Sequence, residues 1–156
     1  TMYDPYDLHA GIGYQLTIAA QTNNTQFEEL LSKLGLTRQM WCVLVAVGEQ
    51  KILMPSAIAD YIGIIRPAVS RTLKQMQHNG LIYRTANGTD KRYTAVALTS
   101  KGQGLLRRSL PLAHETRENI SAMLSGSEQL QLSNILKKNG FKNIRSKITF
   151  RKKASD

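Results

Sequence analysis

Cysteine and histidine are scarce in this sequence, which holds one of the first and three of the second. A single thiol, Cys42, excludes an intramolecular disulfide and a zinc site built from thiolates. His9, His78 and His114 have no Asp, Glu or Cys partner at the spacing of metal ligands. We therefore expect no metal and no cofactor.

Long apolar runs are also missing. No stretch approaches the roughly 20 residues that would span a bilayer, and the first residues have neither the basic start nor the apolar stretch of a signal peptide. No grouping of Ser, His and Asp indicates a nucleophile with an activating base. With 42% hydrophobic residues among 156, the chain is expected to be a single folding unit in the cytoplasm and not an enzyme.

Acidic residues are few, 11 against 21 Lys and Arg, and the excess of positive charge is unevenly placed. Residues 1–65 carry six acids and three bases, whereas residues 66–108 carry nine bases and Asp90 as the one acid. A basic segment inside the folded part is typical of a phosphate-binding surface. The basic C-terminal residues, 143–156, are interpreted as a solvated tail.

The first part of the chain has the apolar spacing of helices. One long amphipathic helix is predicted from about residue 6 to residue 34. Residues 21–26 are poor helix formers, so a break in the middle of that helix stays open. Thr37 is the expected N-cap of a second helix, from Arg38 to about Gly48.

Two further helices follow with a glycine turn between them. Pro55 opens a short helix that Gly63 ends, and Arg66-Pro67 start a longer one, because proline suits the first turn of a helix. The longer helix has one apolar stripe, and its opposite face is basic and polar. The stripe consists of Val69, Leu73 and Met76. This arrangement is typical of a helix-turn-helix, whose second helix enters a DNA groove.

The remaining elements are a hairpin and two helices. Residues 81–84 and 93–98 are rich in β-forming residues and flank a turn-prone segment, which predicts a β-hairpin with a basic tip. Thr99 then caps a long helix, in which Pro111 should cause a kink or a local break. Ser125 or Ser127 starts a last helix, which Gly140 ends.

In this order the chain resembles the MarR family of winged-helix regulators over roughly residues 8–139. The residues that carry the resemblance are Leu36-Thr37 with Trp41, Ser56 to Ile64, Arg66 to Arg71, Gly80-Leu81-Ile82, Asp90 with Arg92, and Val96, Leu98, Thr99 and Gly102. The resemblance implies a mainly α fold with a small β-hairpin wing (α+β). It implies a homodimer on double-stranded DNA, with dimerisation helices in residues 1–36 and 99–142 and a DNA-binding winged helix-turn-helix in residues 37–98.

The family's DNA contacts can be placed on matching positions of this chain. The resemblance puts Arg66, Pro67, Ala68, Ser70 and Arg71 at base edges or the adjacent backbone and Lys74 at a phosphate. Arginine can bond guanine O6 and N7 together, and an alanine methyl can meet the thymine methyl group. Arg92 would enter the minor groove from the wing, with Asp90 holding its side chain. Pro67 departs from the polar residue of many relatives, which removes one base contact.

The resemblance also implies a small-molecule effector between the dimerisation helices and the winged region. The candidates by location are Tyr6, His9, Tyr14, Arg38, Trp41 and Cys42. Arg38 either pairs with an anionic ligand or with a nearby acid. Cys42 is interpreted as a core residue, with an oxidation sensor as the alternative. Similarity to members that control aromatic-acid catabolism suggests an aromatic acid or its CoA thioester.

The sequence therefore predicts a ligand-responsive bacterial transcription regulator, acting as a repressor on a pseudo-palindromic operator. One alternative is a winged helix that binds another protein and no specific DNA sequence. An enzyme acting on an anionic metabolite is a second alternative, which rests on the expected ligand pocket alone.

Overall fold

The computed structural model describes the backbone of residues 4–87 and 90–141 and the side chains of residues 4–86 and 94–140. Within these residues the elements follow one another as eight helical segments and one β-hairpin. They are η1 (Leu8–Ala10), α1 (Ile12–Ser32), α2 (Arg38–Gly48), α3 (Pro55–Ile62), α4 (Arg66–His78), β1 (Ile82–Asn87), β2 (Asp90–Leu98), α5 (Ser100–Ala122), α6 (Gly126–Leu136) and η2 (Lys137–Phe141).

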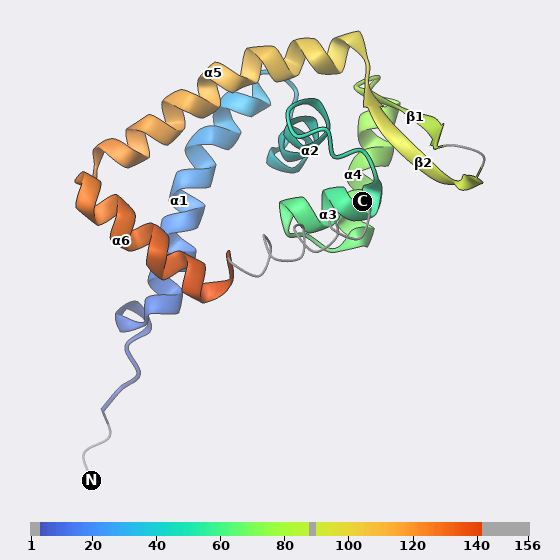
Figure 1. Cartoon of the computed structure of the whole chain (residues 1–156). Coiled ribbons are helices and arrows are strands. Elements are labelled where there is room, and N and C mark those ends of the chain that lie inside the picture. The colour runs from blue at the N-terminus through green and yellow to red at the C-terminus, as the bar shows by residue number, and fades with distance from the viewer. Residues whose placement is uncertain (1–3, 88–89, 142–156) are drawn as a thin grey trace.

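Helix α5 forms an arch that joins two parts of the molecule (Figure 1). At one end it continues from the β1–β2 hairpin, which lies beside α2, α3 and α4. At the other end it leads into α6. The expected fold class, mainly helical with a small antiparallel hairpin, is confirmed. No helix of the described residues is both long and apolar enough to span a membrane.

The start of the chain differs from the expectation of one helix beginning near residue 6. Asp7 caps the short turn η1 by accepting a hydrogen bond from the His9 N–H at 2.9 Å, and Gly11 is extended, so α1 begins only at Ile12. The segment 21–26 does not break α1. Its hydroxyl groups bond carbonyl oxygens one turn back, as Thr22 does to Ile18 O at 2.9 Å, which keeps them compatible with the helix.

The core lies where α2 meets α1, α3, α4, α5 and the hairpin. Helix α2 supplies more buried residues than any other described element, and the predicted stripe of α4 is buried against it. The α2 residues are Met40, Val43, Leu44, Ala46 and Val47. Because apolar burial is the main driving force of folding, α2 acts as the centre on which the other helices pack.

The hairpin and α5 are joined at a close contact. Antiparallel pairing sets Ile82 opposite Leu98 and Arg84 opposite Val96. Thr99 caps α5 as predicted, by accepting from the Gly102 N–H at 3.1 Å, and its hydroxyl also donates to Gly80 O. These bonds fix the direction in which α5 leaves the hairpin.

The two C-terminal helices confirm some boundaries and correct others. Helix α5 runs unbroken through Pro111 and curves along its length (Figure 1), so a local break is not observed. Ser125, and not Ser127, caps α6, in a capping box with Glu128. The last helix ends at Leu136 and passes into the π-turn η2, in which Gly140 has φ 128°.

Candidate nucleic-acid interface

The buried side of helix α4 fixes how the helix is rotated about its own axis. The glycine turn before it is sharp because Gly63 has φ 84°, a left-handed conformation that favours glycine. Val69, Leu73 and Met76 are almost fully buried. The Thr72 hydroxyl donates to Gln39 Oε1 of α2 at 2.9 Å, which adds a polar tie at the same side. The opposite side of α4 therefore has to face outward.

That outward side carries cations and no acid. Arg66, Pro67, Ser70, Arg71 and Lys74 are exposed, and Ala68 is half-buried. The sequence has no acidic residue between Arg66 and His78, so nothing on α4 neutralises these charges. A rigid helix with a basic, small-residue surface fits the phosphates and base edges of a DNA groove. We refer to these six residues as the recognition face.

The structure describes the backbone of both wing strands but not the side chains near the tip of the wing. Asp90 and Arg92 lie at the start of β2, and their side chains fall outside the described residues. Their predicted role in the minor groove stays a prediction. Nearer the base of the wing, Arg84 donates from Nη1 to Thr94 Oγ1 at 3.3 Å. Its Nε is buried without a hydrogen-bond partner among the described residues. In the sequence, Arg84 is one of the nine bases of residues 66–108, and no motif singles it out.

The six predicted effector residues lie in separate places within one chain. Tyr6 is 85% exposed, and the rings of His9 and Tyr14 contact each other with centroids 5.3 Å apart at the start of α1. Trp41 instead packs edge-on against Phe27, with ring centroids 4.8 Å apart. Phe27 lies about 20 Å along α1 from Tyr14, at 1.5 Å per residue. One chain therefore does not bring the aromatic candidates together.

Arg38 and Cys42 share a face of α2 but differ in exposure. Arg38 is exposed beside a hollow of about 530 Å³, the α1–α2 hollow, which Glu28 and Gln75 also line. Cys42 is half-buried and does not belong to the buried core, which corrects its interpretation as a core residue. Burial raises the pKa of its thiol above the ordinary value, and the nearby Arg38 charge lowers it to a smaller extent.

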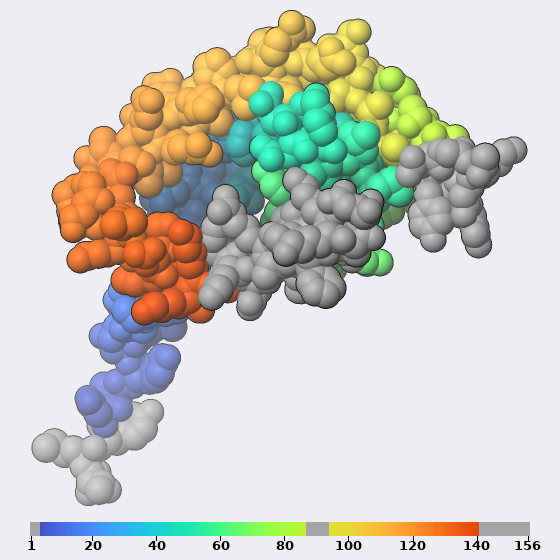
Figure 2. All heavy atoms as spheres, viewed as in Figure 1, coloured from blue at the N-terminus to red at the C-terminus, as the bar shows by residue number. Residues whose placement is uncertain are grey.

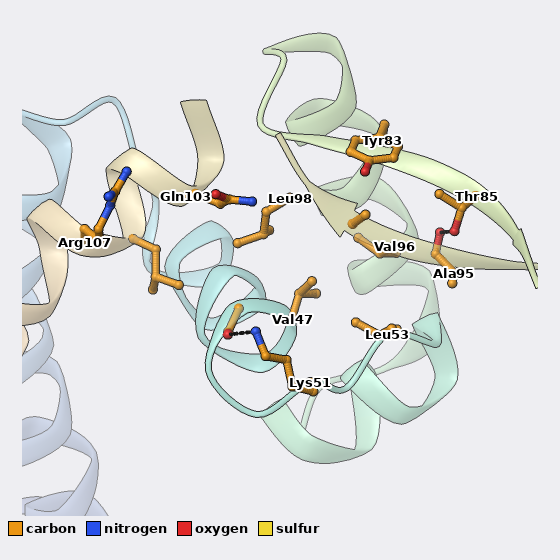
Figure 3. A pocket seen from close by; sticks show the side chains of 13 residues that line it. Val47, Lys51, Leu53, Tyr83, Thr85, Ala95, Val96, Leu98, Gln103 and Arg107 are labelled. Carbon is orange, nitrogen blue, oxygen red and sulfur yellow. Dashed lines mark hydrogen bonds between the residues drawn. The ribbon is translucent and has the colours of Figure 1, made fainter. Parts of the chain in front are cut away.

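A second hollow, which the sequence did not reveal, lies between the hairpin, α5 and the segment after α2 (Figure 3). Its volume is about 550 Å³. We call it the wing hollow; it is lined by Val47, Gly48, Lys51, Leu53, Tyr83, Thr85, Ala95, Val96, Ala97, Leu98, Gln103, Leu106 and Arg107. The lining has an apolar floor, two cations and no acid. Its residues come from two stretches of the chain, 47–53 and 83–107, which are about 30 positions apart, so no local motif could have predicted it.

Lys51 occupies an uncommon backbone conformation at the rim of the wing hollow. Its φ is 55°, in the left-handed region that residues other than glycine seldom adopt. The ammonium group donates to Gly48 O at 2.7 Å (Figure 3), which satisfies a carbonyl at the end of α2. Leu53 O accepts from Val96 N at 2.9 Å, so the same segment is tied to the hairpin.

The end of the molecule opposite the wing exposes a series of large apolar side chains. The first turns of α1 project beyond the rest of the described surface (Figure 2). Exposed apolar residues follow both α1 and α6, although each helix also has a polar side. The residues are Leu8, Ile12 and Ile18 near the start of the chain and Leu130, Leu132, Ile135 and Leu136 on α6.

Comparisons with known proteins agree with this architecture. Residues 34–92 match the model of the MarR family. The HTH-type transcriptional regulator FarR of Neisseria gonorrhoeae is 27% identical over 128 residues, which cover 82% of this chain and 88% of FarR. The homoprotocatechuate degradative operon repressor of Escherichia coli is 25% identical over 129 residues, 83% of this chain and 87% of that protein.

The fold is also that of a solved protein–DNA complex. MepR of S. aureus bound to DNA superposes with a TM-score of 0.77 at 22% identity, over 82% of this chain and 95% of MepR. The matched relatives are regulators rather than enzymes. With its helix-turn-helix, its hairpin and these matches, the chain is similar to the MarR family of winged-helix transcriptional regulators, whose model matches its residues 34–92.

Proposed function

We propose that this protein is a ligand-responsive repressor that binds a pseudo-palindromic operator as a homodimer. The observation that carries the proposal is the recognition face, where cations and small residues are exposed on a helix whose other side is fixed in the core. Residues 37–98 would bind DNA, and residues 1–36 and 99–142 would form the dimer. Asp90 and Arg92 would add the wing contact in the minor groove.

The exposed apolar residues of α1 and α6 support the dimer. Water-exposed Ile12, Leu130 and Ile135 cost free energy in a monomer, and two copies would bury them against each other. A twofold dimer places two copies of α4 about one helical turn of DNA apart, roughly 34–36 Å, which a pseudo-palindrome matches. Occupancy of such a site would block transcription, in keeping with the name of the E. coli relative, a repressor.

DNA binding is tested by fluorescence anisotropy with a duplex selected by the full-length protein from a random library. Affinity should fall steeply between 50 and 200 mM salt, by about 10³- to 10⁵-fold if 6–10 phosphates are contacted. Arg71→Ala should weaken binding by about 1–3 kcal/mol and relax the base preference at one position of each half-site. Arg117→Ala removes the same charge from an exposed position on α5 and should leave affinity unchanged.

The same experiment distinguishes this proposal from the alternative function, a winged helix that binds another protein. A winged helix used only to bind another protein would retain its weak DNA affinity in Arg71→Ala and select no common sequence. Either result would contradict the proposed binding to a specific operator.

We further propose that the effector is an aromatic acid or its CoA thioester and that it binds in the wing hollow. The apolar floor suits an aromatic body, and a lining with Lys51 and Arg107 but no acid suits an anion. The hollow joins the wing to α5, so a ligand there can change the spacing of the two DNA-binding regions. The name of the E. coli relative places that protein at an operon of aromatic-acid degradation.

The alternative effector site is the set predicted from sequence, Tyr6, His9, Tyr14, Arg38, Trp41 and Cys42. It requires a second copy that brings the projecting start of its α1 to the Trp41 region. Thermal-shift measurements with hydroxylated aromatic acids and acyl-CoA esters distinguish the two sites, because a ligand that favours the folded dimer raises the Tm. Loss of the shift in Arg107→Ala supports the wing hollow, and loss only in Arg38→Ala supports the alternative.

A further inference from the structure

Ile65 stands in a position where a large apolar side chain is unusual. It is the N-cap residue of α4, with φ −70° and ψ 147°, and its side chain is 68% exposed. N-cap positions favour Ser, Thr, Asp and Asn, whose oxygen atoms accept a backbone N–H of the first turn, and disfavour isoleucine. Three of the other α-helices that the structure describes follow that rule, with Thr37, Thr99 and Ser125 as their caps.

The first turn of α4 explains how the helix tolerates this residue. A capping side chain usually bonds the second or third backbone N–H of a helix. Here the second residue, Pro67, has no N–H, and the N–H of the third, Ala68, already donates to Ile65 O at 3.1 Å. A polar cap would therefore have little left to bond. This explains why isoleucine is tolerated at the N-cap, but it does not explain why the Ile65 side chain is exposed. The neighbouring Ile64 packs against the core, whereas Ile65 does not.

The location of Ile65 indicates what could cover it. The N-terminal residues of a recognition helix contact base edges in the major groove, and Ile65 directly precedes Arg66 at that end of α4. The apolar group that the major groove presents is the C5 methyl of thymine. Burying a methyl group against a branched side chain removes apolar surface from water on both partners.

We propose that Ile65 is a specificity-determining residue that contacts the methyl group of one thymine in each half-site. The proposal rests on the proposed function, since it requires that α4 lie in the major groove. It adds an apolar contact to the recognition face, beside the polar contacts of Arg66 and Arg71.

The test compares thymine with deoxyuridine, which lacks only the methyl group, at each thymine of the duplex selected by the wild-type protein. Replacing one thymine in a single half-site should weaken wild-type binding about fourfold, and replacing its counterpart in both half-sites about 15-fold, from about 0.8 kcal/mol for a buried methyl group. Ile65→Ser should bind the thymine duplex more weakly and should no longer distinguish it from the deoxyuridine duplex. Ile65→Val, which keeps a branched apolar side chain, should retain most of the discrimination.

Two controls separate base readout from a structural role. Gln77→Ala changes an exposed residue in the last turn of the same helix and should keep the full thymine dependence. The Tm of Ile65→Ser should stay close to that of the wild type, because the Ile65 side chain is 68% exposed and contributes little to the core. Sedimentation of Ile65→Ser should show the same oligomeric state as the wild type.

The proposal is overturned if Ile65→Ser retains the wild-type discrimination against deoxyuridine, or if no thymine methyl affects wild-type binding. Dissociation of Ile65→Ser into smaller species would instead place Ile65 between protein copies and would also overturn it. Failure of the wild type to select any duplex would count against the proposed function itself, a result distinct from normal binding without thymine dependence.

Discussion

Trp41 joins three helices through one side chain. Its ring meets Phe27 of α1 at an interplanar angle of 84°, and its indole N–H donates to Ser109 Oγ of α5 at 3.1 Å. Ser109 is fully buried, and its own hydroxyl donates to Leu106 O at 2.9 Å. These contacts assign Trp41 a packing role within the chain, whatever it also contributes to ligand binding.

Ser109→Ala should lower the free energy of unfolding by about 1–3 kcal/mol, because the indole N–H then lacks an acceptor in a partly buried place. Chemical denaturation followed by the fluorescence of this single tryptophan measures the change. Ser100→Ala, at an exposed position in the first turn of α5, should alter stability by less than about 0.5 kcal/mol. Equal losses in the two variants would contradict a specific role for the Trp41–Ser109 bond.

Cys42 should react slowly as a nucleophile. Its raised pKa leaves less thiolate at neutral pH than a free cysteine has, so alkylation by iodoacetamide should be slow at pH 7 and accelerate only as the pH rises through the elevated pKa. Arg38→Ala removes the cation that lowers this pKa and should slow the reaction further. Alkylation at pH 7 as fast as that of glutathione would show that the thiol is activated instead.

At the scale of elements, the contact between α5 and the hairpin depends on one glycine. A Cβ at Gly102 would overlap the carbonyl oxygen of Leu81, which belongs to the backbone and cannot rotate away. Gly104, two residues further along the same helix, has nothing within 4 Å of such a Cβ. The same substitution at these two positions should therefore have opposite effects.

Gly104→Ala should stabilise the protein by about 0.5–1 kcal/mol, since alanine loses less conformational freedom in a helix than glycine does. Gly102→Ala should destabilise it, because separating α5 from the hairpin loses the Thr99 bonds and the packing of Leu106. Both changes are read from the Tm by circular dichroism. Stabilisation by Gly102→Ala would mean that α5 can shift without cost.

The capping box of α6 gives a prediction about pH. Hydrogen bonds from Ser125, first from its backbone N–H and then from its side chain, lower the pKa of Glu128 below the ordinary value. A lowered pKa means that the stabilisation is present above the ordinary carboxyl pKa and is lost as the pH falls through the lowered one. In Glu128→Gln this contribution to helicity should not change with pH. Wild-type and variant helicity that fall in parallel on acidification would contradict it.

At the scale of the whole molecule, the proposed dimer would be held together by the projecting start of α1 and the apolar residues of α6. Ile135→Glu and Leu130→Glu should convert the dimer into monomers in analytical ultracentrifugation, because a buried carboxylate without a partner is costly. Helical content should remain near that of the wild type, since both residues are exposed within one chain. Gln131→Glu adds the same charge at an exposed polar position of α6 and tests whether charge alone separates the copies. Monomers at all concentrations in the wild type would refute the dimer.

Much of the fold followed from local signals in the sequence. Thr37, Gly63 and Thr99 were identified as helix ends because capping and left-handed residues act on their immediate neighbours, and all three occupy these positions. Local signals failed at the start of α1, and at Pro111 they left a kink and a break both open. There the outcome depends on an extended Gly11 and on a helix that curves but stays continuous through its proline.

The sequence by itself determined the basic segment, the order of helices and hairpin, and which side of α4 faces outward, because apolar periodicity within one helix already separates its buried from its exposed side. Only the tertiary structure decided which side chains share a cavity. It separated Trp41 from Tyr6, His9 and Tyr14 by the length of α1, and it formed the wing hollow from residues 47–53 and the distant residues 83–107. Distances between elements depend on how helices pack, which no local pattern specifies.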